Sequence, residues 1–243
     1  MIGLDGERSE NQRDEDVGLD TLIDEEFEAV IFDMDGTLID STPAVERAWT
    51  VWAGEHGFTR SEMAGTHGVP SAGVVRMFVP AEQQEAAIDR INVLELEDVH
   101  DIVVLPGAAE ALAAVSSSKS AIATSCTIPL AKARIAAAEL VPPTVLVTAD
   151  DVKRGKPAPD PFLEAARRMG VDPSRCLVIE DAPAGLQAAK AAGCFTLAVV
   201  TTTPIDQLHA DGIVTNLSEV TFQVTETGIR VVPAEVDAAN QPS

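Results

Sequence analysis

One short stretch near the N-terminus joins an apolar segment to a pair of acids: Ala29-Val30-Ile31-Phe32-Asp33-Met34-Asp35-Gly36-Thr37-Leu38-Ile39. Its first four residues are apolar, and three of them are β-branched or aromatic, which predicts a buried β-strand. Because side chains alternate across a strand, Asp33 and Asp35 should project to the same side, where the chain turns at Gly36. Two carboxylates held so close repel each other. Such a pair persists only if a cation, a shared proton or open water compensates it.

Beyond residue 105, short apolar segments alternate with alanine-rich segments of helical length. The expected strands are 120–124, 144–148, 176–179 and 195–200, and the expected helices are 108–116, 129–140, 161–169 and 183–192. This alternation is typical of βαβ units, so the predicted fold class is α/β, with a Rossmann-like parallel sheet covered by helices on both faces. Residues 221–232 predict a hairpin that turns near residue 227.

A small helical cap domain is predicted between the first strand and the rest of the core. Ser41-Thr42-Pro43 is a suitable start for a helix that runs to about Gly57, and residues 59–104 show helical periodicity with no convincing strand. The predicted core therefore comprises 27–43 and 105–220, and the cap comprises 44–104. Residues 1–26 are expected to form a flexible acidic tail, and 221–243 a C-terminal hairpin and tail.

Charge and composition exclude several classes of protein. The chain has 243 residues and a formal charge of -22, so nucleic acid is not an expected partner, because phosphate backbones are bound through clustered Lys and Arg. We expect no membrane association, because no apolar run of 18 or more residues occurs. The three cysteines lack metal-binding spacing, and a reducing cytoplasm is the expected setting. A monomer is expected.

Polar and charged groups follow several of the predicted strands. Thr124 and Ser125 lie at the end of the strand at 120–124, and Glu180 and Asp181 follow the strand at 176–179. Between these two pairs lies a basic loop, Lys153-Arg154-Gly155-Lys156-Pro157. In open α/β sheets, ligands bind outside the carboxyl ends of the strands. The sequence therefore predicts that carboxylates, hydroxyls and a lysine converge at one edge of the sheet.

These groups suit phosphoryl transfer. Carboxylate oxygens together with a phosphate favour Mg²⁺, while hydroxyl and N–H groups at a helix start, with Lys156, can hold phosphate oxygens. One aspartate could attack phosphorus while the other protonates the leaving oxygen and later activates water. Each group alone also has a structural interpretation, as a turn, a helix cap or a solvated lysine. Their joint occurrence in this order favours function.

The chain resembles the haloacid dehalogenase-like (HAD) hydrolase superfamily over about residues 27–220. The four segments that carry the resemblance are 33–37 (Asp-Met-Asp-Gly-Thr), 124–125 (Thr-Ser), 155–157 (Gly-Lys-Pro) and 180–185 (Glu-Asp-Ala-Pro-Ala-Gly). Within the superfamily it is similar to the β-phosphoglucomutase-like and sugar phosphatase subgroup, above all to enzymes of the glycerol-3-phosphatase and 2-deoxyglucose-6-phosphatase type.

The resemblance implies catalytic roles. Asp33 would be the nucleophile and Asp35 the general acid and base. Thr124 would bind the transferring phosphoryl group, with the backbone N–H of Ser125, and Lys156 would steady both that phosphate and the nucleophile.

The resemblance also implies a Mg²⁺ site and a cap that closes over the substrate. Asp33, Asp181 and the backbone carbonyl of Asp35 would hold the ion, with Glu180 as a further ligand or a supporting group. In the cap, His67, Gly68 and Arg76 are candidate substrate contacts. Relatives usually carry an arginine shortly after the His-Gly pair, but this chain has Val-Pro-Ser at 69–71.

The predicted function is Mg²⁺-dependent hydrolysis of small phosphorylated polyols or sugars, of the glycerol 3-phosphate or hexose 6-phosphate type, through an aspartyl phosphate. The alternative is a sugar phosphomutase of the β-phosphoglucomutase type. Residues 59–104 contain Arg60, Arg76 and Arg90 but no lysine, which favours the phosphatase. A dehalogenase needs neither Asp35 nor the acidic pair at 180–181. A protein that senses a phosphorylated metabolite without turnover is the non-enzymatic alternative.

Overall fold

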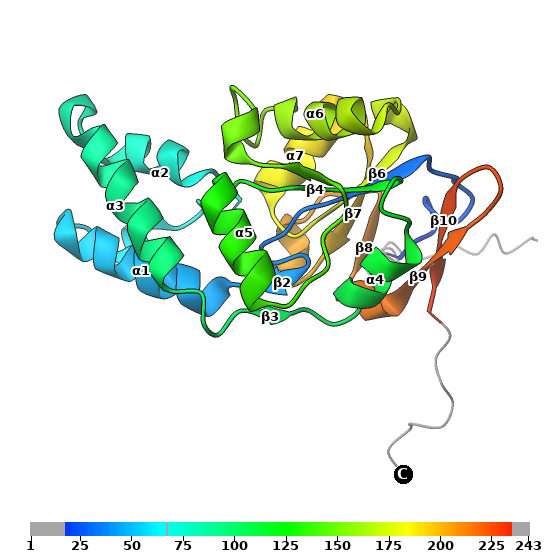
Figure 1. Cartoon of the computed structure of the whole chain (residues 1–243), viewed down its shortest axis with the longest axis horizontal. Helices are drawn as coiled ribbons and strands as arrows, with labels where there is room; N and C mark the ends of the chain where they lie inside the picture. The colour runs from blue at the N-terminus through cyan, green and yellow to red at the C-terminus, as the bar shows by residue number, and fades with distance from the viewer. Residues whose placement is uncertain (1–17, 67, 235–243) are drawn as a thin grey trace, which may run out of the picture.

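The computed structural model describes residues 18–66 and 68–234. A six-stranded sheet in the order β5-β4-β1-β6-β7-β8 forms its centre, and every neighbouring pair in this sheet is parallel (Figure 1). The strands are β1 (Ala29–Phe32), β4 (Ser120–Ala123), β5 (Val145–Val147), β6 (Cys176–Glu180), β7 (Phe195–Val199) and β8 (Gly212–Val214). The predicted α/β, Rossmann-like fold is confirmed.

Strand β1 lies at the point where the strand order reverses. The chain builds outward from β1 to β4 and β5, and then returns to the other side of β1 to add β6, β7 and β8. Phe32, the last residue of β1, lies beside Ile122 of β4 and Ile179 of β6. The carboxyl ends of these three strands are therefore level, and the loops that follow them meet at the position where α/β sheets bind ligands.

Two layers of helices bury the two faces of the sheet. Helices α6 (Asp160–Met169) and α7 (Pro183–Ala192) lie on one side, and α4 (Ala108–Ala114) and α5 (Ile128–Ala137) lie on the other (Figure 1). The alternation of β1 shows this division, because Ala29 and Ile31 join the apolar cluster under α6 and α7, whereas Val30 and Phe32 join the cluster under α5. Both faces of β1 are fully buried, which explains its continuous apolar run.

Three helices form a separate layer at one end of the molecule: α1 (Thr42–Glu55), α2 (Ser71–Phe78) and α3 (Gln84–Glu97) (Figure 1). They enclose their own apolar cluster around Trp52, Val75 and Ile91. The segments that enter and leave this layer pair as two short antiparallel strands, β2 (Ile39–Asp40) and β3 (Val103–Val104). The prediction of no strand within 59–104 is wrong at β3, because a two-residue strand is too short to produce a periodic pattern.

The N-terminal segment joins the core earlier than expected. The predicted tail extends to residue 26, but Leu19 and Leu22 are buried, and Glu26 accepts a hydrogen bond from Thr227 at 2.9 Å. The segment 18–26 is therefore attached to the core through these two leucines, whose apolar area the surrounding acids conceal in the sequence. Residues 1–17 lie outside the described range. The predicted C-terminal hairpin is present as β9 (Val220–Val224) and β10 (Ile229–Pro233).

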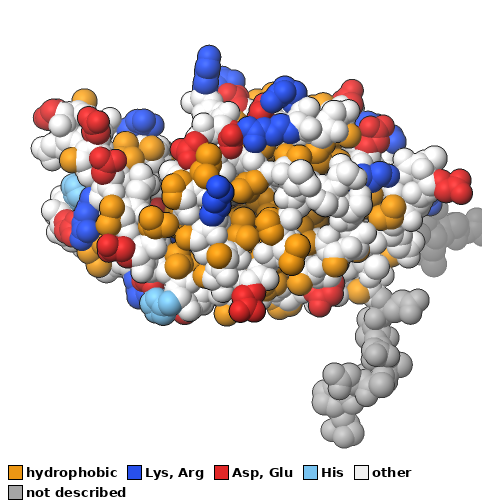
Figure 2. Space-filling model, viewed as in Figure 1, with side chains coloured by type: hydrophobic (Ala, Val, Ile, Leu, Met, Phe, Trp, Pro, Cys, Tyr) orange, Lys and Arg blue, Asp and Glu red, His pale blue; other side chains and the backbone are white. Residues whose placement is uncertain are grey.

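Several boundaries and one strand differ from expectation. The helix predicted at 108–116 ends at Ala114, the helix predicted at 129–140 ends at Ala137, and the short strand β8 was missed. Among the described residues, no helix is both long and apolar enough to cross a bilayer. Acidic side chains are spread over the face shown in Figure 2, while Lys and Arg side chains gather over α6.

Candidate active site

A lysine and three carboxylates meet at the carboxyl end of β1 and β6. Asp33 follows β1, Glu180 ends β6, Asp181 follows it, and Lys156 comes from the loop before α6. Their exposed fractions are only 6%, 1%, 3% and 2%, respectively. The Nζ atom of Lys156 donates to Oδ1 of Asp33 and, at 2.6 Å, to Oε1 of Glu180. The sequence prediction that these residues converge is thus met in the geometry.

Glu180 has a full set of partners. Besides the lysine, its Oε2 accepts the backbone N–H groups of Asp181 and Ala182, both at 2.8 Å. These bonds fix the loop that follows β6. Glu180 therefore orients Lys156 and Asp181. Its oxygens are less available to a bound ion than those of Asp33 and Asp181.

Gly36 allows Asp181 to approach the first loop closely. Its φ of +86° lies in the left-handed region, and a Cβ added there would stand 2.3 Å from Oδ2 of Asp181. Thr37 donates to Oδ1 of Asp181 at 3.3 Å, and Thr202 donates to Oδ2. Only glycine fits at position 36 without displacing the carboxylate.

Burial dominates the electrostatics of this group. It raises the pKa of Asp33 well above its ordinary value, an effect that Lys156 opposes and that Glu180 and Asp181 reinforce. Burial, with Glu180 nearby, raises the pKa of Asp181 to about 8. Burial alone would lower the pKa of Lys156, but Asp33 and Glu180 outweigh it, and its pKa is raised. Three carboxylates thus face a single buried cation, and an additional positive charge would stabilise their ionised forms.

The donor set fits a hard divalent cation. Asp33, Glu180 and Asp181 each offer an oxygen, and these oxygens lie within 4.8 Å of one another. Such oxygen donors suit Mg²⁺, which commonly keeps several waters and takes only one or two carboxylates from the protein. Asp33 and Asp181 are the carboxylates that would hold the ion, while Glu180, already bound to Lys156 and to two backbone N–H groups, would support them.

Mg²⁺ should stabilise the protein more strongly at high pH than at low pH. A metal binds the ionised carboxylate, and the pKa of Asp181 is raised from 3.8 to about 8, so protons compete with the metal below that range. Without metal, the folded state holds this proton more tightly than the unfolded state, so stability should fall as pH rises from about 4 towards 8. Thermal unfolding with EDTA and with Mg²⁺, at about pH 6 and about pH 9, measures both trends. An equal gain from Mg²⁺ at the two pH values would contradict the assignment.

The loop after β4 differs from expectation. Helix α5 begins at Ile128 with Thr127 as its N-cap, so Thr124 and Ser125 lie in the preceding loop and not at the helix start. The hydroxyl of Thr124 accepts the N–H of Cys126 at 3.1 Å, and the hydroxyl of Ser125 donates to the carbonyl of Gly68 in the cap at 2.9 Å. The loop thereby contacts the cap.

Asp35 accepts hydrogen bonds through both of its carboxylate oxygens, more strongly through Oδ1. Its Oδ1 accepts from Ser41 at 2.6 Å and from Arg134 of α5 at 2.8 Å, and its Oδ2 accepts from the Sγ of Cys126 at 3.0 Å. Burial raises the pKa of the Cys126 thiol well above its ordinary value, so the sulfur keeps its proton. Arg134 is a residue of the site that the sequence did not predict. Its signal was a charged residue on the buried face of α5, four residues after Leu130.

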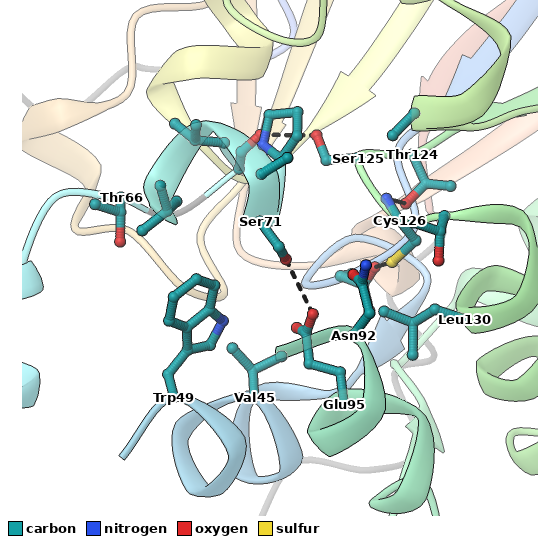
Figure 3. Close-up of a pocket in the computed structure, with 18 of the residues that line it drawn as sticks. Val45, Trp49, Thr66, Ser71, Asn92, Glu95, Thr124, Ser125, Cys126 and Leu130 are labelled. Atoms are coloured by element: carbon teal, nitrogen blue, oxygen red, sulfur yellow. Dashed lines mark hydrogen bonds between the residues drawn. The ribbon is translucent and has the colours of Figure 1, made fainter. Parts of the chain in front are cut away.

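A cavity of about 340 Å³ lies between the cap and these loops (Figure 3). Its apolar lining includes Val45, Trp49, Val74, Ile88 and Leu130. Its polar lining includes Asp33, Asp35, Thr66, Ser71, Asn92, Glu95, Thr124, Ser125 and Arg134. This volume is typical of a small-molecule site. Asp33 and the loop at 124–125, called the phosphate loop below, line the core side of the cavity, and the cap lines the other side.

The structure brings only part of the predicted cap contacts to this cavity. Gly68 lines it, with φ of +76°, and its carbonyl contacts Ser125. Arg76 is exposed on α2 and is not among the residues that line the cavity, because its position faces away from the apolar side of that helix. His67 lies outside the described residues.

The fold and the site together define a capped α/β hydrolase of the phosphoryl-transfer type. The model of the haloacid dehalogenase-like hydrolase family matches residues 27–193, and the chain belongs to that family. The predicted resemblance is thereby confirmed.

Three similar proteins illustrate the relationship. Hexitol phosphatase A of Escherichia coli is 40% identical over 82% of this chain and 95% of its own length. Glycerol-1-phosphate phosphohydrolase 1 of Saccharomyces cerevisiae is 35% identical over 76% of this chain and 79% of its own. Among solved structures, a hydrolase from Pseudomonas syringae superposes with a TM-score of 0.72 at 28% identity, over 78% of this chain and 94% of that one. The predicted enzyme class, a phosphoric monoester hydrolase, is confirmed by the family and these phosphatases.

Proposed function

We propose that the protein is a Mg²⁺-dependent phosphatase that hydrolyses monophosphates of neutral polyols or sugars through an aspartyl phosphate. The observation that carries the proposal is the lining of the cavity. Opposite the phosphate loop it combines an apolar wall with two polar groups of α3, Asn92 and Glu95. Glu95 accepts from Ser71 and Arg134 through its two oxygens, so the amide of Asn92 is the group of α3 left for substrate hydroxyls. A polyol has carbon-bound hydrogens for the apolar wall and hydroxyls for that amide, whereas α3 offers no free cation for an acidic leaving group.

The charges around the cavity favour hydrolysis over phosphomutase chemistry. A mutase must hold a second phosphate, and that task requires accessible cations in the cap. Arg60 lines the cavity but pairs with Glu46 at 2.8 Å, and Arg90 pairs with Glu55 at 2.7 Å on the surface. Within the part of the cap that the structure describes, no Lys or Arg faces the cavity without an acidic partner. These pairs support a substrate with a single phosphate.

The residues divide the reaction into two steps. In the first, Asp33 forms a bond to phosphorus as the ester P–O bond breaks, and Asp35 gives its proton to the leaving oxygen. In the second, Asp35 takes a proton from water as that water attacks phosphorus, and the bond between phosphorus and Asp33 breaks to release phosphate and restore the carboxylate. Lys156 and the loop at 124–125 hold the phosphate oxygens. Mg²⁺, when bound, would offset the negative charge of phosphate and carboxylates.

A phosphate-release screen tests the proposal. With Mg²⁺, we expect phosphate from hexitol phosphates, glycerol phosphates or hexose 6-phosphates, with kcat/KM at least about tenfold above that for phosphoglycolate, whose leaving alcohol carries a carboxylate. EDTA should abolish the activity. Hexose bisphosphate should be a poor substrate and should not stimulate interconversion of hexose phosphates. Release from none of the neutral monophosphates, or efficient interconversion without release, would contradict the proposal.

A further inference from the structure

A buried chain of polar contacts links Asp35 to the cap. Arg134 of α5 donates from Nη1 to Asp35 at 2.8 Å and from Nη2 to Oε1 of Glu95, on α3, at 3.3 Å. The other oxygen of Glu95 accepts from the hydroxyl of Ser71, the first residue of α2, at 2.9 Å. Figure 3 shows the side chains of Ser71 and Glu95 in the cavity lining, pointing toward each other and joined by this bond. Two cap helices therefore reach Asp35 through a single guanidinium group.

The burial of this chain makes its partners interdependent. Arg134 is 3% exposed and Glu95 is 4% exposed, so neither can exchange its partner for bulk water. The guanidinium also contacts the Sγ of Cys126 at 3.2 Å, and its Nε has no hydrogen-bond partner among the described residues. Asp35 and Glu95 are thus the two acidic partners of Arg134. Movement of the cap away from the core would remove one of them and leave the guanidinium to Asp35 alone.

We propose that Arg134 and Glu95 are positioning residues that orient Asp35 when the cap is closed. This inference rests on the proposed function, in which Asp35 is the proton donor. Ser41 and Arg134 hold Oδ1 with two strong donors, whereas Oδ2 accepts only the weak S–H donor of Cys126, so we assign the transferred proton to Oδ2. With the cap closed, Glu95 shares the guanidinium, and Arg134 is fixed between two carboxylates. The core alone therefore holds Asp35 less rigidly than the core and cap together.

The consequence is a defect that depends on the leaving group. Departure of an alkoxide, as from glycerol phosphate, needs the proton of Asp35 while the P–O bond breaks and the Asp33–P bond forms. Departure of p-nitrophenolate needs no such proton, because this anion is stable in water. The value of kcat/KM reports the steps up to the first irreversible one. A displaced Asp35 should therefore lower kcat/KM for the alkyl ester and spare the aryl ester.

Glu95→Gln and Arg134→Lys test the proposal against wild type with both kinds of ester. We expect kcat/KM for the best polyol or sugar monophosphate of the screen to fall by about tenfold or more, and that for p-nitrophenyl phosphate by less than about threefold. Inhibition by inorganic phosphate should be unchanged, because Thr124, Ser125 and Lys156 are intact. The double variant should be little worse than the poorer single variant, because both substitutions interrupt one chain.

Glu55→Gln is the matched control. It removes a cap carboxylate that pairs with Arg90 on the surface, and both kcat/KM values should remain at the wild-type level. Equal losses with the two esters in Glu95→Gln and Arg134→Lys would overturn the proposal in favour of a structural defect. Additive losses in the double variant would overturn it in favour of direct contact between Glu95 and the substrate. A wild-type protein inactive on every ester would instead refute the proposed function itself.

Discussion

Replacement of Asp33 by Asn is expected to lower kcat by about 10⁴-fold or more, with no phosphoenzyme detectable. The amide keeps the shape of the side chain but cannot form the acyl phosphate bond, and it removes one carboxylate from the proposed metal site. Purified variant and wild type should be compared by phosphate release and by acid quenching during turnover, which traps an aspartyl phosphate.

Asp35→Asn provides the contrast. Its amide cannot move a proton, but Asp33 remains able to attack, so an aryl phosphate should still form the phosphoenzyme. That intermediate should then accumulate, because the base that activates water is lost. Equal loss of phosphoenzyme formation in the two variants would contradict the division of labour between Asp33 and Asp35.

Replacement of Lys156 by Met is expected to be costly for both folding and catalysis. The lysine is the only cation in contact with buried Asp33 and Glu180 among the described residues, and its loss leaves those carboxylates without compensation. Removal of one partner of a buried ion pair typically costs about 3 to 5 kcal/mol of unfolding free energy. We expect a loss of that size by urea denaturation in EDTA, and a fall in kcat of about 10²-fold or more with Mg²⁺.

Lys132→Met is the control for this prediction. Lys132 is exposed on α5, and its replacement should change the unfolding free energy by less than about 0.5 kcal/mol. Mg²⁺ should restore part of the stability that Lys156→Met loses, because a cation beside Asp33 compensates the same charge. A Lys156→Met protein as stable as wild type in EDTA would show that its carboxylates are protonated in the folded state.

The parts of the site that could be predicted follow single strands. Asp33 lies directly after β1, and Glu180 and Asp181 lie at the end of β6, so each position follows from a local apolar run and the rule that parallel strands end at one edge. Periodicity is a local property, and it is strongest where both faces of a strand are buried. Shorter elements gave no such signal, which is why β3 and β8 were missed.

Contacts between distant elements could not be predicted in this way. Arg134 and Asp35 are 99 residues apart, and their ion pair depends on how α5 packs against the loop after β1. Leu22 gave no sign of burial among its acidic neighbours, yet it packs fully into the core. In both cases the deciding quantity is the burial of a side chain by segments that are remote in sequence.

The sequence by itself determined the α/β class, the order of the core elements and the identity of the acids, hydroxyls and lysine at the sheet edge. These depend on local periodicity and on the chemistry of each residue type. Only the tertiary structure decided that Glu180 is hydrogen-bonded to Lys156 and to the following loop, that Arg76 lies away from the cavity, and that Glu95 pairs with Arg134. Those outcomes depend on which side chains the cap and the sheet bury together, because a buried charge needs a partner within contact distance.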